Sequence, residues 1–397
     1  MTADITLRGP GDVVAVLPYQ LGYQPHDSVV AVSMRGRRVG LVARADLPPD
    51  EHAEAVAATL VGPVVRDGAT SVLVVGFEDV PDASLPLGTA LVEQLERAGV
   101  EVLDVAVVRD GRRYSAICSD PCCPPEGVPL PEPADVPGIA ELVAMGRSPL
   151  PSRAAVDRVV EPDLPSCAGV ADAVLARSEV SARRRRRRAV AAWRVVLRDP
   201  SGEWRRAGAS GPGALRARTD AVGPRADPVV VADLALGLHD VAWRDGLIAW
   251  LAPGVLPVER LDADVVQLLR SSLPAWGGMG FHAPPGAAEV AGSTDGDATR
   301  RAVLAVMHAD LGQRLLAVCR SVPDECPDEA AAVCTVAAHV AWAQGDGALA
   351  RAAVERALRL RPDYRLAVLL EQLIEGGVRL PVRSRPPREP GALGWAG

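Results

Sequence analysis

The spacing of apolar residues in the first 120 positions alternates between the periods of strands and of helices. Valine-rich runs at residues 28–34, 38–46 and 71–77 predict strands, and the uninterrupted third run predicts a strand buried on both faces. Apolar residues recur at helical spacing within residues 51–65 and 85–98, so these two segments predict amphipathic helices.

Two short turns predict hairpins in the same region. Gly36 lies between the first two valine-rich runs, and the dipeptide formed by Asp110 and Gly111 lies between two further apolar runs. Helices therefore alternate with single strands and hairpins along the chain. This order predicts an α/β domain over residues 1–120, with a mixed sheet, two hairpins and helices packed on it.

The pattern changes after the predicted sheet. Residues 121–137 are proline-dense without periodicity, which predicts a loop and linker. Residues 138–380 have helical spacing, with continuous helical patterns at residues 171–197 and 229–251. Residues 381–397 are rich in proline and arginine and predict a flexible tail. We therefore expect an all-α C-terminal domain.

One helical pair near the end of this domain has a more specific spacing. Gly345, Asp346, Ala350, Ala357 and Pro362 stand at the spacing of the second half of a tetratricopeptide repeat. The small side chains let two helices approach closely, and the glycine and aspartate form the turn. No second copy is found, so the pair predicts a tetratricopeptide-like hairpin that ends the helical domain and offers a surface to a protein partner.

Charge and composition exclude some classes of protein. The net charge is −7, and 48% hydrophobic with 23% charged residues is typical of a globular protein. An acidic chain is not expected to bind nucleic acid through its overall charge. No apolar run reaches the roughly 20 residues needed to cross a membrane, and the first residues lack the pattern of a secretory signal. We therefore expect a cytoplasmic protein without a membrane span.

Three of the seven cysteines lie close together after Tyr114. Cys118, Cys122 and Cys123 have the spacing C-x3-C-C, which supplies one pair of zinc ligands but no second pair, so no metal site is predicted. A redox-active disulfide and a nucleophilic thiol activated by a nearby base remain open. The remaining interpretation is that buried thiols pack a turn stiffened by proline.

A polar loop precedes the first predicted strand. His26, Asp27 and Ser28 stand there, and Asp27 or Ser28 can satisfy backbone N–H groups of the turn. Arg44 and Asp46 share one face of the next strand, as a surface pair or as part of a site. If the two hairpins lie side by side, this loop and the cysteine segment share one edge of the sheet and form a pocket.

A basic run interrupts the helical domain. Residues 183–188 are six consecutive arginines, which cover every face of a helix because six residues exceed one turn. No aromatic residue is interleaved and the whole chain is acidic, so a nucleic-acid partner is not expected. The run predicts a solvated face, or a salt-sensitive contact with an acidic partner or RNA.

Several segments together resemble a known family. They are LGYQPHDSVV at residues 21–30, ARADLP at 43–48, YSAICSDPCCPPEG at 114–127, WRDGLIAWL at 243–251 and AWAQGDGALARAAVERAL at 341–358. They resemble uncharacterised actinobacterial proteins that are catalogued as a domain of unknown function. The chain contains no lysine or asparagine, whose codons are AT-rich, and this fits a GC-rich source of that kind. The resemblance implies no activity and no catalytic residues.

These observations lead to two functional expectations. The chain has no recognised catalytic motif, so the first is a cytoplasmic interaction or regulatory protein. The second is an enzyme or ligand-binding protein, with a site in the α/β domain between the loop of residues 26–28 and that of residues 118–123. The sequence indicates no particular cofactor and no oligomeric state.

Overall fold

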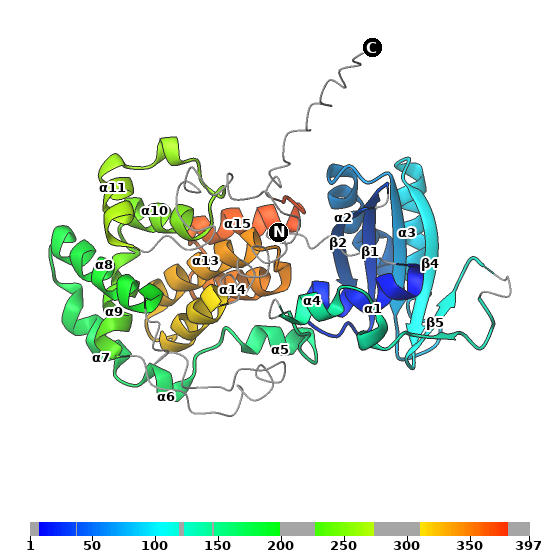
Figure 1. Ribbon diagram of the computed structural model, residues 1–397, viewed down its shortest axis with the longest axis horizontal. Coiled ribbons are helices and arrows are strands. Elements are labelled where there is room, and N and C mark those ends of the chain that lie inside the picture. The colour runs from blue at the N-terminus through cyan, green and yellow to red at the C-terminus, as the bar shows by residue number, and fades with distance from the viewer. Residues whose placement is uncertain are drawn as a thin grey trace, which may run out of the picture.

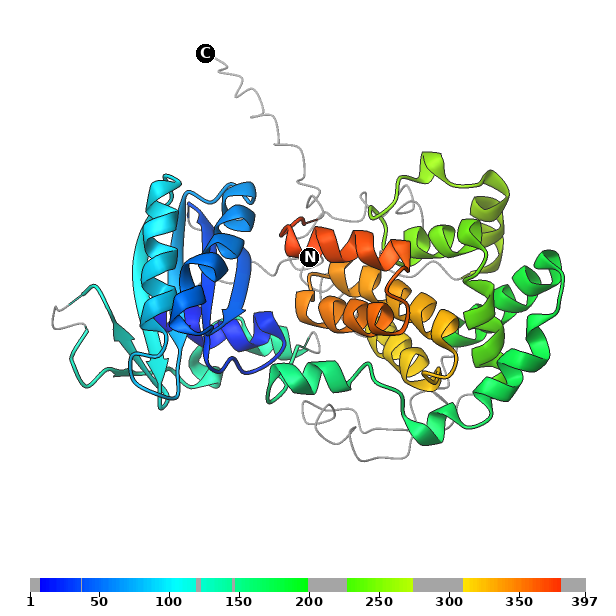
Figure 2. The same ribbon diagram turned by 180° about the vertical axis from the view of Figure 1, so that it is seen from behind.

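The computed structural model describes residues 8–36, 38–118, 123–144, 147–198, 227–273 and 310–379. The chain forms two parts that lie side by side, a sheet with its helices and a larger helical part (Figure 1). Seen from behind, the chain crosses from one part to the other below the centre of the molecule (Figure 2). Within the described ranges, no helix is long and apolar enough to span a membrane.

The described part of the sheet has six strands in the order β2-β1-β3-β4-β5-β6. The strands are β1 (Ser28–Arg35), β2 (Arg38–Asp46), β3 (Ser71–Phe77), β4 (Glu101–Arg109), β5 (Arg112–Ser115) and β6 (Val128–Pro129). Antiparallel pairing joins β1 to β2 and β4 to β5, which confirms both predicted hairpins. β3 is antiparallel to β1 and parallel to β4, so the sheet is mixed as expected.

Alternate side chains of the strands face two separate layers of helices. The helices of this part are α1 (Pro10–Leu21), α2 (Ala53–Arg66), α3 (Leu85–Arg97) and α4 (Ile139–Ala144). Val29 and Ala31 of β1 pack with α2 and α3 on one face, and Val30 and Val32 pack with α1 on the other. β3 is buried along its whole length, as its uninterrupted apolar run predicts. α3 connects the parallel strands β3 and β4.

Part of the segment at residues 121–137 belongs to the sheet. The two residues of β6 pair with β5, where the sequence predicts only a loop and linker. A strand of two residues has no detectable period, which is why the pattern does not indicate it. Further along, Val136 and Ile139 pack against Val16 of α1, so α4 covers the outer side of that helix.

The helical part follows from residue 153. Its helices are α5 (Arg153–Arg158), α6 (Leu164–Cys167), α7 (Val170–Ser178), α8 (Ala182–Arg198), α9 (Pro228–Gly237), α10 (Val241–Leu251), α11 (Ala263–Ser272), the helical residues 310–321, α13 (Pro327–Ala343), α14 (Gly347–Leu360) and α15 (Arg365–Glu375). Trp193 and Trp243 are fully buried in its main apolar core. The predicted helices at residues 171–197 and 229–251 are each divided in two, the first into α7 and α8 and the second into α9 and α10. The break in the first lets α7 and α8 both pack against α9.

α13 and α14 form a helical hairpin at the position that the spacing indicates. Gly345 has a left-handed φ of 79°, and the Asp346 carboxylate caps α14 by accepting from the Leu349 N–H at 3.0 Å. Ala350 and Ala357 are fully buried, and they let the two helices approach closely.

Arg356 of α14 is a fully buried arginine that ties several segments together. Its Nη1 donates to the carbonyl oxygens of Val160 and Cys319 at 2.6 and 2.7 Å. Its Nη2 donates to the Val322 carbonyl at 2.7 Å and to Asp324 at 2.8 Å. The guanidinium therefore satisfies backbone groups that would otherwise be buried without partners.

In the described residues, contacts at two places hold the sheet part against the helical part. The Gln24 N–H donates to the Leu150 carbonyl, and the Leu150 N–H donates to the Gly22 carbonyl, both at 2.8 Å. These bonds form a short parallel bridge below β2. On the other side, Arg66 at the end of α2 donates through Nη2 to the Gly376 carbonyl just after α15, at 2.6 Å.

Candidate functional site

The polar loop before β1 is held mainly by backbone bonds. His26 and Asp27 are exposed, whereas Ser28 is fully buried and its Oγ has no hydrogen-bond partner. Asp27 has a φ of 35°, its carbonyl accepts from the Leu47 N–H at 2.9 Å, and its Oδ1 accepts from the Asp79 N–H at 3.2 Å. Asp27 therefore satisfies N–H groups of two neighbouring loops, as the sequence indicates.

Arg44 and Asp46 lie on the edge strand β2 and form an ion pair at 2.5 Å. The two side chains differ in burial, since that of Arg44 is 11% exposed and that of Asp46 is 78% exposed. Arg44 Nη2 also donates to the His26 carbonyl at 3.2 Å, and the guanidinium lies 5.5 Å from the centre of the Tyr23 ring. Arg44 is thus fixed in place, and its Nε–H is buried without a partner.

The cysteine segment lies far from this loop, which overturns the shared pocket. Ser28 aligns with Phe77 in β3, Phe77 with Val108 in β4, and Val108 with Arg113 in β5. β5 starts at this end of the sheet and runs away from it, and Cys118 follows three residues after the last residue of β5. Three strand spacings add about 14 Å across the sheet. The strand β3 separates the two hairpins, and the two loops lie three strands apart in the sheet.

Tyr114 packs against residues of the sheet part. Its ring lies against the Cα of Gly127, where an added Cβ would come within 2.7 Å of a ring carbon. Arg109 lies 4.9 Å above the ring and pairs with the buried Glu78 at 2.8 Å. Burial raises the pKa of the Glu78 carboxyl, but hydrogen bonds from Ser84 and from a neighbouring N–H, together with Arg109, outweigh it and lower that pKa.

The cysteines show no metal centre in the part of the chain that the structure describes. Cys118 and Cys123 are partly buried, and Cys122 lies outside the described residues. No group of three or more His, Cys, Asp or Glu side chains among the described residues is placed to hold a metal ion. In the helical part, burial raises the pKa of the Cys167 and Cys326 thiols to about 11, so both are protonated at neutral pH.

A cavity lies between the two parts, and we call it the edge-strand cleft. Its volume is about 1450 Å³. One wall is the edge strand β2 with the start and end of α1, and the opposite wall is α5, the turn between α13 and α14, and the residues after α15. Arg44 and Asp46 line it, whereas His26, Ser28, Tyr114 and the cysteines do not.

The lower end of the edge-strand cleft is built around Tyr23. This side chain is 4% exposed and packs into an apolar cluster of the helical part. Burial raises the pKa of its hydroxyl, and the nearby charges of Arg44 and Arg153 partly oppose that rise. Arg153 donates through Nη1 to the Ala348 carbonyl at 2.9 Å and through Nη2 to Glu355 at 3.1 Å. Tyr23 thus joins an arginine of β2 to an arginine of α5.

A second carboxylate faces the same end of the cleft. Asp157 Oδ1 is buried and lies 3.2 Å from Arg153 Nη2, but the angles do not make a hydrogen bond. Asp346, at the start of α14, has its pKa raised chiefly by burial, while the Leu349 N–H and the charges of Arg147 and Arg153 act in the opposite direction. The cleft therefore contains a buried donor at Arg44 and a buried acceptor at Asp157, neither of which makes a hydrogen bond to a described residue, although Asp157 is ion-paired with Arg153.

The sequence does not indicate most of this site. Tyr23 stands within the segment LGYQPHDSVV, and Gly22 beside it has a left-handed φ of 80°, so this segment carries a usable signal. Arg147 and Arg153 stand in no recognisable motif. They reach the cleft because Leu150 pairs with residues 22–24, a contact between distant positions that no local pattern predicts.

The chain matches the model of a protein family described as "Domain of unknown function (DUF4192)", over residues 10–275 and 277–380. Since these ranges include most of the chain, the protein belongs to this family. Comparisons with curated proteins and with solved structures find no match. The family assignment covers both walls of the edge-strand cleft and carries no assigned activity.

Proposed function

We propose that this protein is an interaction module that binds an extended polypeptide segment in the edge-strand cleft, as an added strand on β2. The observation that carries the proposal is the open edge of β2, which stands at the end of the strand order and lines the cleft. Alternate residues of an edge strand direct unpaired N–H and C=O groups outward, and an extended peptide can pair with them.

The size of the cleft favours a polypeptide over a small metabolite. Pockets for small molecules typically enclose roughly 300–1,000 Å³. The edge-strand cleft has about 1450 Å³ and follows a strand of nine residues. Such a strand is about 30 Å long, which matches an extended peptide of similar length.

The two unsatisfied polar atoms support a ligand with backbone-like groups. The Nε–H of Arg44 and the Oδ1 of Asp157 are both buried without a hydrogen bond to a described residue. A bound peptide would offer an oxygen to the first atom and an N–H donor to the second. An unpaired buried polar group costs about 1–3 kcal/mol. A peptide that satisfies both atoms would recover that free energy on binding.

The proposal includes three expectations from the sequence, which concern the helical hairpin, the cellular location and the origin of the protein. A tetratricopeptide-like character of the hairpin formed by α13 and α14 would suit a wall that receives a peptide, and the turn at Gly345 lines the cleft. We also propose a cytoplasmic location and an actinobacterial origin, which the composition favours. The alternative of a catalytic site shared by the two loops is not kept, because the strand order separates them.

Two neighbouring proline substitutions test the proposal. Residues that follow each other in β2 direct their N–H groups to opposite sides, so Val42→Pro and Ala43→Pro affect different edges. One proline removes a bond to β1 and lowers the midpoint of thermal unfolding. The other removes only an outward donor and leaves that midpoint almost unchanged.

Binding is measured with twelve-residue peptides selected from a random displayed library on the full chain, using fluorescence polarisation. The proline variant with the unchanged midpoint is expected to bind them at least about tenfold more weakly, because strand pairing is interrupted. Arg44→Gln is expected to weaken binding as well. Equal binding by the stable proline variant and the wild type would contradict the proposal.

A further inference from the structure

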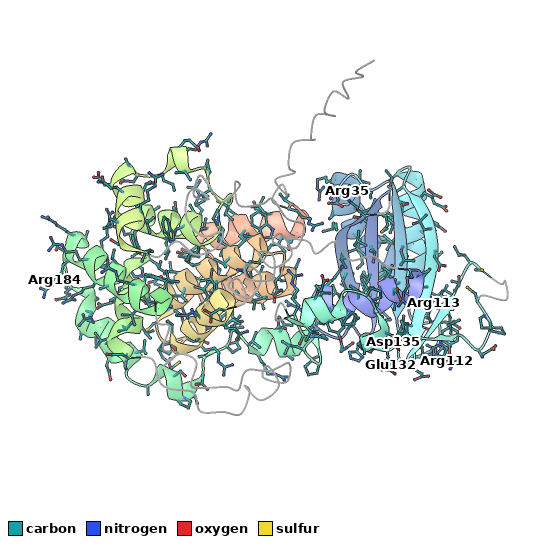
Figure 3. The ribbon with its side chains drawn as sticks, viewed as in Figure 1. Arg35, Arg112, Arg113, Glu132, Asp135 and Arg184 are labelled. Carbon is teal, nitrogen blue, oxygen red and sulfur yellow. The ribbon has the colours of Figure 1, made fainter. Side chains whose placement is uncertain are left out.

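A second surface lies at the opposite side of the helical part from the cleft. Arg183, Arg184, Arg187 and Arg188 occupy one side of α8, because positions four apart follow each other along a helix. We call these four side chains the arginine face. Figure 3 shows Arg184 projecting from α8 at the border of the molecule, away from the sheet.

The structure divides the six arginines of the run into two groups. Arg186 pairs with Asp240 at 2.6 Å, and Arg185 donates to the Ser178 carbonyl at 3.0 Å, so these two hold α8 against its neighbours. None of the four side chains of the arginine face makes a hydrogen bond or an ion pair to any described residue. Their charges are therefore not used in the fold that the structure describes.

The position of the arginine face is unfavourable for the helix itself. The run lies in the first two turns of α8, where the partial positive charge of the helix N-terminus disfavours cations. Like charges four residues apart repel each other as well. Residues 170–198 carry nine arginines against two acidic residues, a net charge of +7 within a chain of net charge −7. No contact within the described fold offsets this electrostatic repulsion, which indicates that the arginine face binds a ligand.

An apolar strip continues the arginine face along the same side of the helix. Ala191 is exposed, and Val195 is 49% exposed although it is a branched apolar residue. Positions 184, 188, 191 and 195 follow each other at steps of three or four residues, so they share one side of α8. The surface therefore presents positive charge first and apolar area next.

We propose that the arginine face binds a short acidic segment of a partner protein, in which the carboxylates are followed by apolar side chains. Guanidinium groups bind carboxylates in pairs of hydrogen bonds, and an apolar side chain of the partner covers Val195. This site is independent of the edge-strand cleft.

The charge distribution favours a short polypeptide over a nucleic acid. The run rises only about 8 Å along the helix axis. A long polyanion that extends beyond it meets the rest of the chain, whose net charge is −14 when the +7 of residues 170–198 is taken from the total of −7. Repulsion acts within the Debye length of about 8 Å at physiological salt, whereas an acidic segment of four or five residues ends with the patch.

The test uses the full chain and a labelled twelve-residue peptide with four consecutive glutamates followed by two leucines. The variant carries Arg183→Gln, Arg184→Gln, Arg187→Gln and Arg188→Gln. The matched control removes four exposed arginines elsewhere through Arg97→Gln, Arg158→Gln, Arg260→Gln and Arg365→Gln. Both variants change the net charge by the same amount, and circular dichroism confirms that both fold.

The wild type is expected to bind the peptide, the first variant at least about tenfold more weakly, and the control within about twofold. Raising the salt from 50 to 200 mM is expected to weaken wild-type binding several-fold. Equal losses of peptide affinity in the two variants would show that net charge alone determines binding, and this would overturn the proposal. Absence of peptide binding at 50 mM salt would overturn it too, as would tighter binding of a labelled RNA or duplex DNA of twenty nucleotides or base pairs.

Discussion

The arginines differ between the two surfaces. In the edge-strand cleft the guanidinium groups of Arg44 and Arg153 are paired, and on the arginine face of α8 they are not paired with any described residue. In the cleft, Arg153 is held by the Ala348 carbonyl and Glu355, and Arg44 is held by Asp46 and the His26 carbonyl. On the arginine face, no described residue holds any of the four guanidinium groups. Fixed donors favour specific hydrogen bonds, whereas unpaired charges favour attraction that salt weakens.

We therefore expect the two surfaces to suit different kinds of binding. The cleft offers an ordered wall with a strand edge, so its affinity is expected to depend on the backbone and side chains of the peptide. The arginine face offers charge without fixed geometry, so it is expected to accept many acidic sequences. Measurements of unfolding should separate arginines that stabilise the fold from arginines that do not.

The largest effect is expected at the fully buried Arg356. Arg356→Met removes the guanidinium donor from three carbonyl oxygens, and we expect the free energy of unfolding to fall by about 3–5 kcal/mol. Arg359→Met is the matched control on the same helix, because its ion pair with Glu161 is half-exposed and weak. Urea unfolding measures both. Similar losses in the free energy of unfolding for the two variants would show that the buried arginine contributes no more to stability than the half-exposed one.

A smaller loss is expected for a held arginine of the cleft. Arg153→Gln removes the donors to Ala348 and Glu355, and the Arg153 side chain is only 22% exposed. We expect the free energy of unfolding to fall by about 1–3 kcal/mol. Arg351→Gln serves as the control, since that side chain is 43% exposed and lies 4.0 Å from Glu355. If Arg153→Gln leaves the free energy of unfolding unchanged, the arginines of the cleft contribute as little to stability as those of α8.

A pH effect is expected from the carboxyl of Asp346. Burial raises its pKa in the folded state, so the folded state retains a proton that the unfolded state releases. Its contribution to stability is therefore greatest below the unfolded pKa of about 3.9, and it is lost as the pH rises through the raised value. Asp346→Asn keeps the helix cap and removes this dependence. Urea unfolding at several pH values between 4 and 7 should show a less negative slope in the variant.

The smallest effect on stability is expected on α8. Replacing the four residues of the arginine face by glutamine should leave the midpoint of thermal unfolding within about 2 °C of the wild type, since three of the side chains are exposed, the Arg188 side chain is partly buried and none is paired with a described residue. Differential scanning fluorimetry at low salt is the suitable measurement. A fall of more than about 5 °C would show that the arginine face supports the fold.

The sequence predicts the elements of this protein better than their arrangement. Both hairpins are found because each turn contains a glycine that takes a left-handed conformation, Gly36 and Gly111, and this preference is local. The place of β3 between β1 and β4 depends on contacts between distant segments. The pocket predicted between the polar loop and the cysteines is therefore wrong, although each loop is found at the end of its predicted strand.

Sequence patterns indicate even less of the candidate site. Alternation along a strand indicates Arg44 and Asp46, and both line the edge-strand cleft. Arg153 and Asp157 have no such signal, because a short helix of six residues in an arginine-rich chain has no distinctive pattern. In the same way, the arginine run does not indicate which two of its six side chains make contacts in the described fold and which four do not.

The bond from Arg66 to the Gly376 carbonyl has a consequence for biosynthesis. The residues that close the upper side of the edge-strand cleft, 376–379, are translated more than three hundred positions after β2. Domains fold in the order in which the ribosome releases them, so β2 presents its bare edge throughout the synthesis of the helical part. During that interval the proposed peptide site lacks one of its walls, and we expect it to be complete only after residues 376–379 have been synthesised.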